Sequence, residues 1–514
     1  MTRFDWGTTW PTAAEFTELA RERRVIPVVR RILADDLTPV GIYRRLARNQ
    51  PGTFILESAE ADGAWHRWSF VGVRAQATLL ADGDDVRWLG DPPVSVPASG
   101  APLEILRGTL DALHTEPLPG LPPLTGGLVG ALGWDACWYF HPDLTKVAPE
   151  ELHLPDLALM LVADMVAIDH HDGSAWLIAN AINTNDTETG VEEAYQDTVR
   201  RLDALASGLT EPSPAIASTH RPVTVPRTMR TSQGEYEESV REVKREIARG
   251  TCEQVVLSGR LDLDCDADPL DVYRALRTIN PSPYMYLLHL PGGPAGNFHV
   301  VGSSPETLIK VSAGTVTTFP IAGSRPRGRT PAHDRDLERE MLADEKEVAE
   351  HVMLVDLAKD DLGQICTPES IDVEGYMRVQ RFSHIMHITS TVTGALQEGK
   401  TALDALAHAF PAGTLSGSPR RKAIEVIDAL EPARRGIYGG TVGYFDFAGE
   451  MDMAIAIRTA VISGGVASVQ AGAGLVAGSD PHTEYLETRS KAEAAVRAVE
   501  VAAGLAPLTG AGDG

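Results

Sequence analysis

The sequence predicts an α+β fold in which large antiparallel β-sheets pack as a sandwich with flanking helices. Most strand-like segments follow one another without an intervening helix, which favours antiparallel pairing over a parallel, doubly wound sheet. Clear amphipathic helices with start and stop signals separate the remaining strands. With 514 residues, the chain is too long for one ordinary core, so we expect two domains.

The N-terminal part is predicted to be a mixed region of strands and helices. Segments 53–60 and 66–90 read as successive strands, and 192–209 as an amphipathic helix. Residues 126–136 contain four glycines, typical of a strand that another backbone approaches closely. A Pro-, Ser- and Thr-rich segment at 210–227 is the candidate linker. We therefore expect domains at 1–222 and 223–514.

The C-terminal part begins with a predicted helix, which a capping box of Ser232 and Glu235 opens and Gly250 ends. Two further helices are predicted at 345–363 and 401–409, and a last one begins at Pro481, with Asp480 as its cap. Segment 410–423 reads as a loop. The predicted strands are 253–264, 279–290, 300–311 (interrupted by a small-residue turn), 315–328, 381–394, 437–447, 450–462 and 467–478.

Composition excludes several classes of function. The chain is 43% hydrophobic and 23% charged, as in soluble globular proteins. Its net charge of −25 argues against nucleic acid or an anionic membrane as a main partner. Its four cysteines lack metal-binding spacing and suit a reducing compartment, and the N-terminus lacks the apolar core of a signal peptide. We expect a cytoplasmic protein.

Two pairs of glutamates are candidate metal ligands. Glu347 and Glu350 share one face of the helix at 345–363, and Glu484 and Glu487 share a face of the last helix. Like charges at this spacing repel, so each pair requires solvent or a cation. Two such helices together supply the oxygen ligands that Mg²⁺ prefers. The alternative is chance surface pairs in a chain with 71 acidic residues.

Arg458 is a candidate carboxylate-binding residue. On an alternating strand it shares a face with alanines, so its guanidinium would project from a small-walled floor and grip a carboxylate in bidentate fashion. An ion pair at a sheet margin is the alternative. Gly472–Ala473–Gly474 exposes backbone N–H groups that bind anions, although turns also require glycine.

Three further side chains are candidates for chemistry. His387 is either a general acid or base or a structural residue. Glu306 lies in the small-residue turn and is a general acid if poorly solvated, or otherwise an ordinary turn carboxylate. Thr414 donates a hydrogen bond to a substrate or caps its loop. The sequence contains no nucleophile motif, P-loop or dinucleotide fingerprint. The residues alone indicate an Mg²⁺-dependent enzyme for a small carboxylate-bearing molecule.

Six blocks between about 225 and 500 resemble the chorismate-utilising enzymes in order and spacing. They are PIAGSRPRG, DEKEVAEHVMLVDLAKDDLG, SHIMHITSTVTG, PAGTLSGSPR, AIAIRTA and QAGAGLVAGSDPHTEYLET. The chain is most similar to the members that make anthranilate for tryptophan biosynthesis. The resemblance implies the family's fold and Mg²⁺ held by Glu350 and Glu487, with Glu347 and Glu484 in support. The residues that it implies for substrate binding are Gly323, Ser324, Tyr438, Arg458, Gly472, Ala473 and Gly474.

The same resemblance implies a reaction. Ammonia attacks C2 of chorismate as the C4 hydroxyl leaves, and loss of pyruvate then gives an aromatic ring. Glu306 is the implied proton donor, Thr414 steadies the ring, and His387 matches the catalytic histidine. Members that add water carry a lysine base where Gln254 stands, and those making 4-amino-4-deoxychorismate carry a nucleophilic lysine at the position of Ala322. Both positions favour anthranilate.

Other readings remain at this point. One is an ammonia-using relative that stops at 2-amino-2-deoxyisochorismate or makes aminodeoxychorismate, and the other is a non-catalytic acidic binding protein. The chain also departs from the common pattern of the family at four positions. These positions are Ala131, Ser324, Ser418 and Arg420.

Regulation and a partner are implied as well. Segments 56–58 and 280–285 resemble a feedback site for tryptophan, for which an aromatic and apolar wall with polar anchors is suitable. The implied contacts are Ser58, Pro283, Tyr284, Met285, Val442 and Tyr444. No glutaminase segment is present in this sequence. The family pairs its large subunit with a separate glutamine amidotransferase that delivers ammonia, so we expect a heterotetramer of two large and two small subunits.

Overall fold

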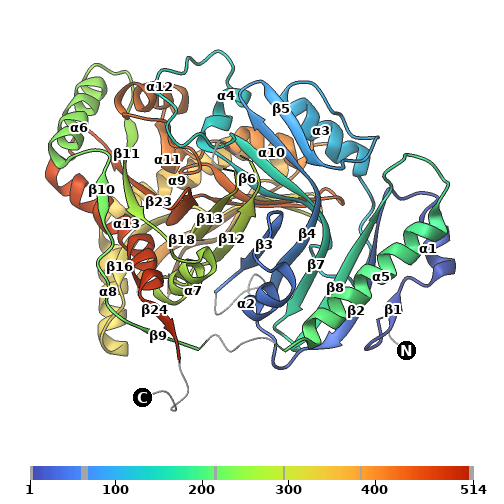
Figure 1. Ribbon diagram of the computed structural model, residues 1–514. Coiled ribbons are helices and arrows are strands. Elements are labelled where there is room, and N and C mark those ends of the chain that lie inside the picture. The colour runs from blue at the N-terminus through green and yellow to red at the C-terminus, as the bar shows by residue number, and fades with distance from the viewer. Residues whose placement is uncertain (1–3, 60–66, 213–216, 293–295, 382–384, 509–514) are drawn as a thin grey trace, which may run out of the picture.

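The computed structural model describes residues 4–59, 67–212, 217–292, 296–381 and 385–508. Over this part of the chain, 22 strands join in one continuous network of antiparallel pairs, and helices pack around it (Figure 1). The predicted combination of a large antiparallel sheet and flanking helices is confirmed. None of the described helices is long and apolar enough to cross a membrane.

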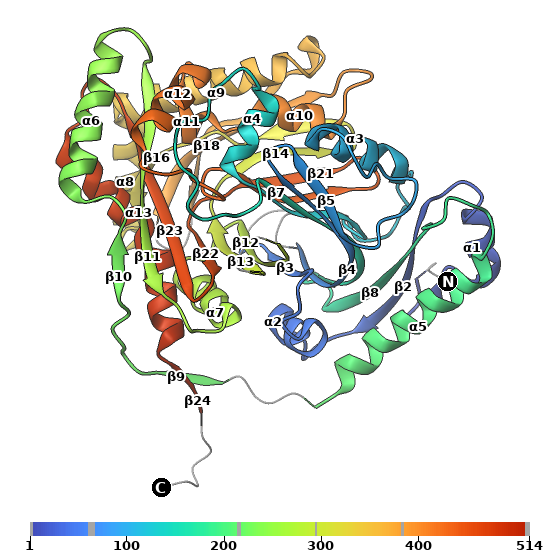
Figure 2. The same ribbon diagram turned by 45° about the horizontal axis from the view of Figure 1, so that its top comes forward.

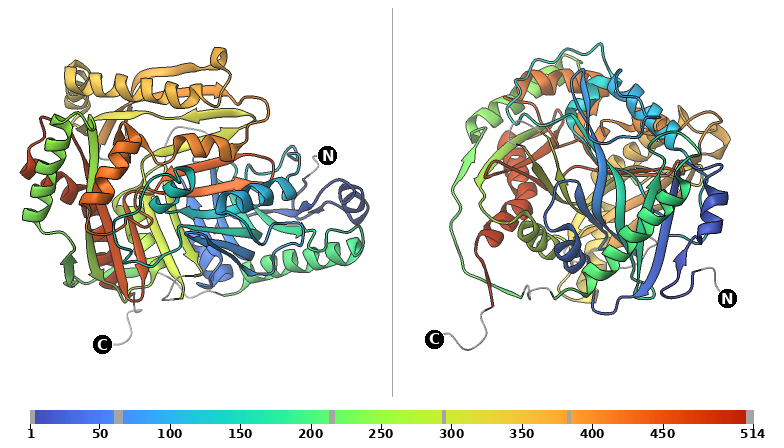
Figure 3. Two further views of the ribbon diagram at one scale, coloured as in Figure 1. Left: turned by 90° about the horizontal axis from the view of Figure 1, so that it is seen from above. Right: turned by 45° about the vertical axis from the view of Figure 1, so that its right-hand side comes forward.

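The N-terminal part is built on long strands, of which β4, β7 and β8 are the most extended. Helix α5 lies along β2 and β8, at the end of the molecule remote from α6 and α13 (Figures 1 and 3). In chain order its elements are β1 (Thr9–Trp10), α1 (Ala13–Leu19), β2 (Val25–Leu33), α2 (Pro39–Ile42), β3 (Thr53–Glu57), β4 (Trp68–Asp82), β5 (Asp85–Gly90), α3 (Pro102–Leu113), β6 (Gly127–Leu132), α4 (Cys137–Phe140), β7 (Leu157–Asp169), β8 (Ser174–Ile182) and α5 (Val191–Thr210).

The C-terminal part opens with two elements that the sequence marks clearly. The predicted capping box at Ser232 and Glu235 is present at the start of α6, and the predicted strand after it is β11. The elements up to β18 are β9 (Ser218–His220), β10 (Arg227–Met229), α6 (Gln233–Ala248), β11 (Gln254–Asp264), α7 (Pro269–Ile279), β12 (Tyr284–Leu290), β13 (Phe298–Ser304), β14 (Thr307–Ser312), β15 (Thr315–Thr318), β16 (Ile321–Pro326), α8 (Pro331–Ala343), α9 (Glu345–Gly363), β17 (Asp372–Arg381) and β18 (Ile385–Ala395).

The last segment of the chain corrects two predictions. The predicted loop at 410–423 contains a short helix and the start of another, and the predicted strand at 450–462 is two strands with a break between them. The remaining elements are α10 (Ala402–Ala409), α11 (Gly413–Ser416), β19 (Gly417–Ser418), α12 (Arg420–Leu430), β20 (Thr441–Asp446), β21 (Met451–Ile455), β22 (Thr459–Ser463), β23 (Val466–Leu475), α13 (Pro481–Ala503) and β24 (Leu505–Pro507).

Strand pairs connect the two halves of the sequence. β3 pairs with β12, so the N-terminal strand lies beside β12 and β13 (Figure 2). β6 pairs with β20, with Gly130 opposite Gly443. The predicted linker contains β9, which pairs with β24 near the C-terminus. The division at residue 222 stays a prediction, but the sheet and its apolar clusters run across it.

The helices that carry the glutamate pairs pack on opposite sides of the same region. α9 packs on β16 and β18, burying Val355 and leaving Val348 and Val352 half-buried. α13 packs on β23 and α7 through small residues such as Ala495 and Val499, which lets the helix approach the sheet closely. Packing of apolar side chains thus fixes the positions of both helices.

The glycine-rich strand at 126–136 is confirmed as a site of close approach. A Cβ at Gly130 of β6 would overlap the carbonyl oxygen of Ala158 in the neighbouring β7. Gly130→Ala is therefore expected to destabilise the protein by about 1–3 kcal/mol, the usual cost of forcing extra atoms into a filled site. Urea unfolding measures this change.

The matched control is Gly234→Ala. Gly234 lies in the first turn of α6 with open space where its Cβ would stand. Alanine favours a helix over glycine, so this variant is expected to be as stable as the parent or slightly more so. Equal stability of the two variants would contradict the close approach at Gly130.

Candidate active site

Two capped helices bring the glutamate pairs toward each other. Asp344 accepts hydrogen bonds from the backbone at the start of α9, and Asp480 does so for α13. Burial raises the pKa of Glu350, and the nearby charges of Glu347 and Glu487 raise it further. Since Glu487 belongs to α13, the charges of the two helices act on one another at Glu350.

The carboxylates of the two helices share two lysines. Lys346 and Lys491 partly offset the repulsion felt by Glu350 and Glu484. Lys491 Nζ lies 2.7 Å from Glu487 Oε1. Within the described residues, no three His, Cys, Asp or Glu side chains gather closely enough to hold a metal ion. The four carboxylates are thus not gathered into a formed metal site, although their hard oxygens are the type of ligand that Mg²⁺ prefers.

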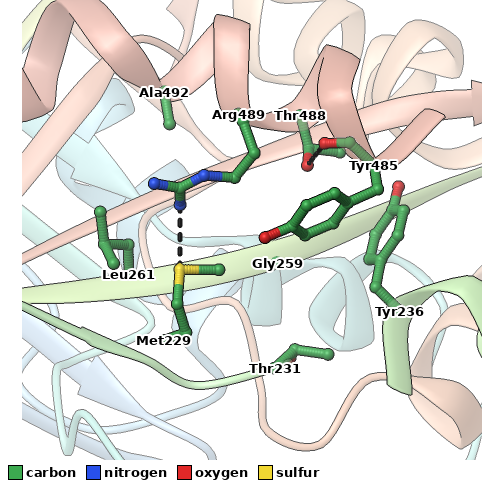
Figure 4. Close-up of a pocket in the computed structure, with 9 residues that line it drawn as sticks. All are labelled: Met229, Thr231, Tyr236, Gly259, Leu261, Tyr485, Thr488, Arg489 and Ala492. Carbon is green, nitrogen blue, oxygen red and sulfur yellow. Dashed lines mark hydrogen bonds between the residues drawn. The ribbon is translucent and has the colours of Figure 1, made fainter. Parts of the chain in front are cut away.

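Another face of α13 anchors the helix. Tyr485, Thr488, Arg489 and Ala492 line a small cavity with residues of α6, β10 and β11 (Figure 4). In it, Arg489 Nη1 donates to the Met229 sulfur at 3.0 Å. None of the predicted site residues lines this cavity. Its contacts hold α13 against α6, β10 and β11.

His387 lies on β18 beside the glycine loop of β16. One ring nitrogen, Nδ1, lies 3.0 Å from the carbonyl oxygen of Gly323, and Ser324 is its register partner. A carbonyl oxygen only accepts, so Nδ1 carries the proton and Nε2 is the basic nitrogen of the neutral ring. Burial lowers the pKa of His387, the bond to Gly323 and the Glu347 charge raise it, and Arg458 lowers it.

Gly323 explains how α9 approaches this histidine. Its φ of +69° is in the region that favours glycine, and a Cβ there would lie 3.3 Å from Glu347 Oε2. Arg325 Nη1 donates to Glu347 Oε1 at 3.4 Å and Nη2 donates to Asp344 Oδ2 at 2.9 Å. The strand and the helix are therefore held together next to His387. The neighbouring His384 lies outside the described residues.

The strand position predicted for Arg458 is wrong, although its place in the site is supported. Arg458 stands in the break between β21 and β22 with a φ of +53°, so it does not alternate with the alanines around it. Its Nη1 donates to the Lys491 carbonyl oxygen of α13 at 2.7 Å. Burial lowers the pKa of Arg458, while Tyr438 and Glu487 raise it. The guanidinium thus lies among the predicted substrate and metal residues.

Tyr438 and the Gly472–Ala473–Gly474 segment lie in contact. A Cβ at Gly472 would be 2.9 Å from the Tyr438 hydroxyl oxygen, so only glycine leaves this oxygen room. Burial raises the pKa of Tyr438 to about 12, so the hydroxyl keeps its proton at neutral pH and is available as a donor. The segment itself lies on β23, opposite β11.

Glu306 is the buried acid of the site. It lies in the predicted turn between β13 and β14, enclosed by protein except for a small exposed part, and Thr414 Oγ1 donates to its Oε1 at 2.9 Å. Burial raises the pKa of Glu306, and the Thr414 bond and the Lys491 charge lower it. The condition for a general acid, poor solvation, is met.

Lys491 is the site residue that sequence reasoning missed. Besides its ion pair with Glu487, its Nζ donates to the Gly472 carbonyl oxygen at 3.2 Å, and its charge lowers the pKa of Glu306, Glu350 and Glu484. The available signal was its spacing of four residues from Glu487, which places both on one helix face.

Comparison with known proteins decides the family. Residues 51–497 match the family described as chorismate binding enzyme, which covers most of the chain. The chain belongs to the chorismate-binding enzymes. It is 51% identical to anthranilate synthase component 1 of Mycolicibacterium smegmatis over 494 residues, which cover 96% of this chain and 94% of that protein.

Solved structures of the family have the same fold. The crystal structure of anthranilate synthase component I from Streptococcus pneumoniae matches with a TM-score of 0.74 at 30% identity, over 91% of this chain and 99% of that one. The menaquinone-specific isochorismate synthase of Escherichia coli matches with a TM-score of 0.68 at 19% identity, over 95% of this chain and all of that one, which shows the fold alone.

The two positions predicted to set specificity lie beside other predicted site residues. Gln254 begins β11, and a Cβ at Gly474 would be 2.9 Å from its amide nitrogen. Ala322 is buried on β16 next to Gly323 and opposite Ile388 of β18. Both positions therefore border residues predicted to bind the substrate.

The predicted regulatory residues lie together around β3, β12 and β20. Met285 is opposite Glu57, the neighbour of Ser58, and the buried Ser58 hydroxyl oxygen has no hydrogen-bond partner among the residues that the structure describes. The Tyr284 hydroxyl donates to Asp452 Oδ1 at 3.0 Å. Three of the predicted contacts belong to one apolar cluster, namely Tyr284, Val442 and Tyr444. Pro283 is buried at the start of this segment.

Thr414→Val tests the bond to Glu306. In the folded state the pKa of Glu306 is raised above its ordinary value of 4.5, so the free energy of unfolding falls as pH rises from 4.5 until the folded pKa is passed. Losing the Thr414 donor raises this pKa further. In Thr414→Val the free energy of unfolding is therefore expected to keep decreasing up to a higher pH than in the parent. Urea unfolding at a series of pH values measures this.

Thr109→Val is the control. The buried Thr109 hydroxyl donates to the Ile105 carbonyl oxygen and to no carboxylate in the described residues. Its loss should lower the free energy of unfolding by about 1 kcal/mol at every pH. An identical pH dependence in the two variants would show that Thr414 does not control the ionisation of Glu306.

Proposed function

We propose that this chorismate-binding enzyme is the large subunit of an anthranilate synthase, which converts chorismate and ammonia to anthranilate and pyruvate. The observation that carries the proposal is the placement of a buried, protonatable Glu306 in one site with Arg458, His387 and the facing glutamate pairs. The 51% identity to an anthranilate synthase component 1 supports it. The catalytic part is 223–514, and the regulatory part is 1–222.

The cation in this proposal is Mg²⁺. Glu350 and Glu487 would hold it, with Glu347 and Glu484 in support through water, because Mg²⁺ retains several waters. Bound there, it would neutralise a substrate carboxylate that the acidic surroundings otherwise repel. The raised pKa of Glu350, caused in part by Glu347 and Glu487, supports a site that gains stability from a cation.

The chain's own side chains bind and orient the substrate. One substrate carboxylate and the enolpyruvyl end are held by Arg458, the Tyr438 hydroxyl and the backbone of Gly472 to Gly474. The other side of the substrate is closed by Gly323 and Ser324. The cation of Arg458 is buried and therefore interacts strongly with an anion. These groups place C2 and C4 of the ring near the acid and the histidine.

Proton transfers follow from the two titratable groups. Glu306 gives its proton to the C4 hydroxyl, which leaves as water while ammonia attacks C2, and Thr414 holds the resulting carboxylate. In the second step His387 takes the C2 proton, the C3–O bond breaks, and pyruvate leaves from an aromatic ring. Its lowered pKa keeps His387 a neutral base near neutral pH. Neither Gln254 nor Ala322 provides a lysine, which favours ammonia over water and anthranilate over aminodeoxychorismate.

The ammonia comes from a partner in this proposal. A separate glutamine amidotransferase would supply it, in a heterotetramer of two large and two small subunits. Alone, the chain is expected to use free ammonium at raised pH, where more of the ammonium is deprotonated. The protein acts in the cytoplasm, where chorismate is consumed for tryptophan biosynthesis.

The test is product formation from chorismate, ammonium and Mg²⁺. Fluorescent anthranilate and pyruvate are expected in equal amounts, and 2-amino-2-deoxyisochorismate or aminodeoxychorismate as the end product would favour the related activities.

Glu350→Gln should lower the rate by roughly 100-fold or more, because a charge at the cation site is lost. Glu345→Gln, in the exposed first turn of the same helix, is the control and should retain activity. Absence of anthranilate with the parent protein would refute the proposal.

We further propose that tryptophan binds between β3, β12 and β20 and inhibits the enzyme. The Ser58 hydroxyl, unpartnered within the described residues, offers a polar anchor. Tyr284, Val442 and Tyr444 offer an aromatic and apolar wall, and Pro283 and Met285 are the other proposed contacts. An unpaired buried hydroxyl costs free energy that a bound amino acid would recover.

Ser58→Arg is expected to abolish inhibition by tryptophan while leaving the uninhibited rate nearly unchanged, since the arginine fills the site. Inhibition curves with increasing tryptophan measure this. Ser207→Arg, on the exposed surface of α5, is the control and should be inhibited like the parent. Unchanged inhibition in Ser58→Arg would place the effector elsewhere.

A further inference from the structure

Arg435 is a fully buried cation beneath the site, with a side chain only 1% exposed. Its Nε and Nη2 donate to the two carboxylate oxygens of Glu431 at 3.0 and 2.7 Å. Nη1 donates to the Leu415 carbonyl oxygen at 2.8 Å, and Nη2 also donates to the Val256 carbonyl oxygen at 2.6 Å. One planar group thus connects three segments that are far apart in the sequence.

These contacts lie next to residues of the proposed site. Leu415 follows Thr414 directly in α11. Val256 of β11 is opposite Gly474 of β23. The guanidinium also lies 5.5 Å from the ring centre of Tyr438. Arg435 therefore holds the neighbour of Thr414, bonds the strand that pairs with the glycine segment, and lies near the Tyr438 ring. The residues that accept its hydrogen bonds are not themselves predicted substrate ligands.

The carboxylate of Glu431 completes the arrangement. Glu431 Oε1 accepts hydrogen bonds from the backbone N–H and the hydroxyl of Ser258, which is opposite Gly472. The ring of Trp134, from the N-terminal part, lies 4.2 Å from the guanidinium carbon. A buried ion pair adds little stability compared with a well-packed apolar pair, so stability alone does not account for it. The fixed positions that this ion pair gives to the surrounding segments do account for it.

We propose that Arg435 is a positioning residue for the reaction, which holds Thr414 on Glu306 and Tyr438 against Gly472. The inference rests on the proposed function, because it assigns Glu306 as the acid. Lysine cannot replace arginine in this role, since a single ammonium group does not reach four acceptors arranged around a planar fork.

Arg435→Lys tests the proposal in the parent assay with ammonium. A misplacement of about 1 Å can cost roughly 100-fold in rate, so kcat is expected to fall by about this factor, with a smaller rise in KM for chorismate. Loosening the Thr414 bond also raises the pKa of Glu306, while Lys491 remains in place. The acid then keeps its proton to a higher pH, and the alkaline limb of the kcat profile shifts upward.

Arg434→Lys is the matched control. This neighbouring arginine donates to the Ala148 carbonyl oxygen and lies 3.8 Å from Glu150, so its partners belong to the N-terminal part of the chain. Its kcat and pH profile should equal those of the parent. A double variant, Glu431→Met with Arg435→Met, removes both buried charges and is expected to fold but to show the same loss of kcat.

The outcomes separate the two proposals. If the parent makes no anthranilate, the proposed function fails. If the parent is active and Arg435→Lys keeps its kcat, or loses kcat with an unmoved alkaline limb, the positioning role is overturned. A double variant with the kcat of the parent overturns it as well, even where Arg435→Lys does not fold.

Discussion

The approach of α13 to α9 sets the charge balance of the site. The charge of Glu487 on α13 raises the pKa of Glu350 on α9, and the charges of Lys346 and Lys491 lower it. Packing of small residues of α13 on β23 and of α9 on β16 and β18 holds these carboxylates in place against their repulsion. Apolar packing thus fixes the positions at which these charges interact.

Local patterns in the sequence predicted local structure well. The bounds of α9, the capping box of α6 and the turn at Glu306 all depend on residues within a few positions of each other. The resemblance to known family blocks then predicted which residues meet in space. The structure does bring Gly323, His387 and Glu347 together, although these residues come from three different elements.

What the sequence could not indicate depends on long-range contacts. Alternation placed Arg458 on a strand, but the chain breaks there because the Arg458 guanidinium bonds the backbone of α13. The spacing of Lys491 from Glu487 indicates their ion pair, but the hydrogen bonds of Lys491 and Arg435 go to acceptors on distant segments, which no spacing rule reveals. Helix α11 escaped notice because four residues between prolines and glycines carry no periodicity.

The strand pairs that join β3 to β12 and β6 to β20 have a consequence for evolution. At this seam Gly127 leaves room for the Phe445 carbonyl, and Gly130 faces Gly443, so the fit is between backbones as well as side chains. A chimera that took its first half from one relative and its second from another would inherit mismatched edges. Productive recombination is therefore confined to crossover points that keep each of these strand pairs from a single parent.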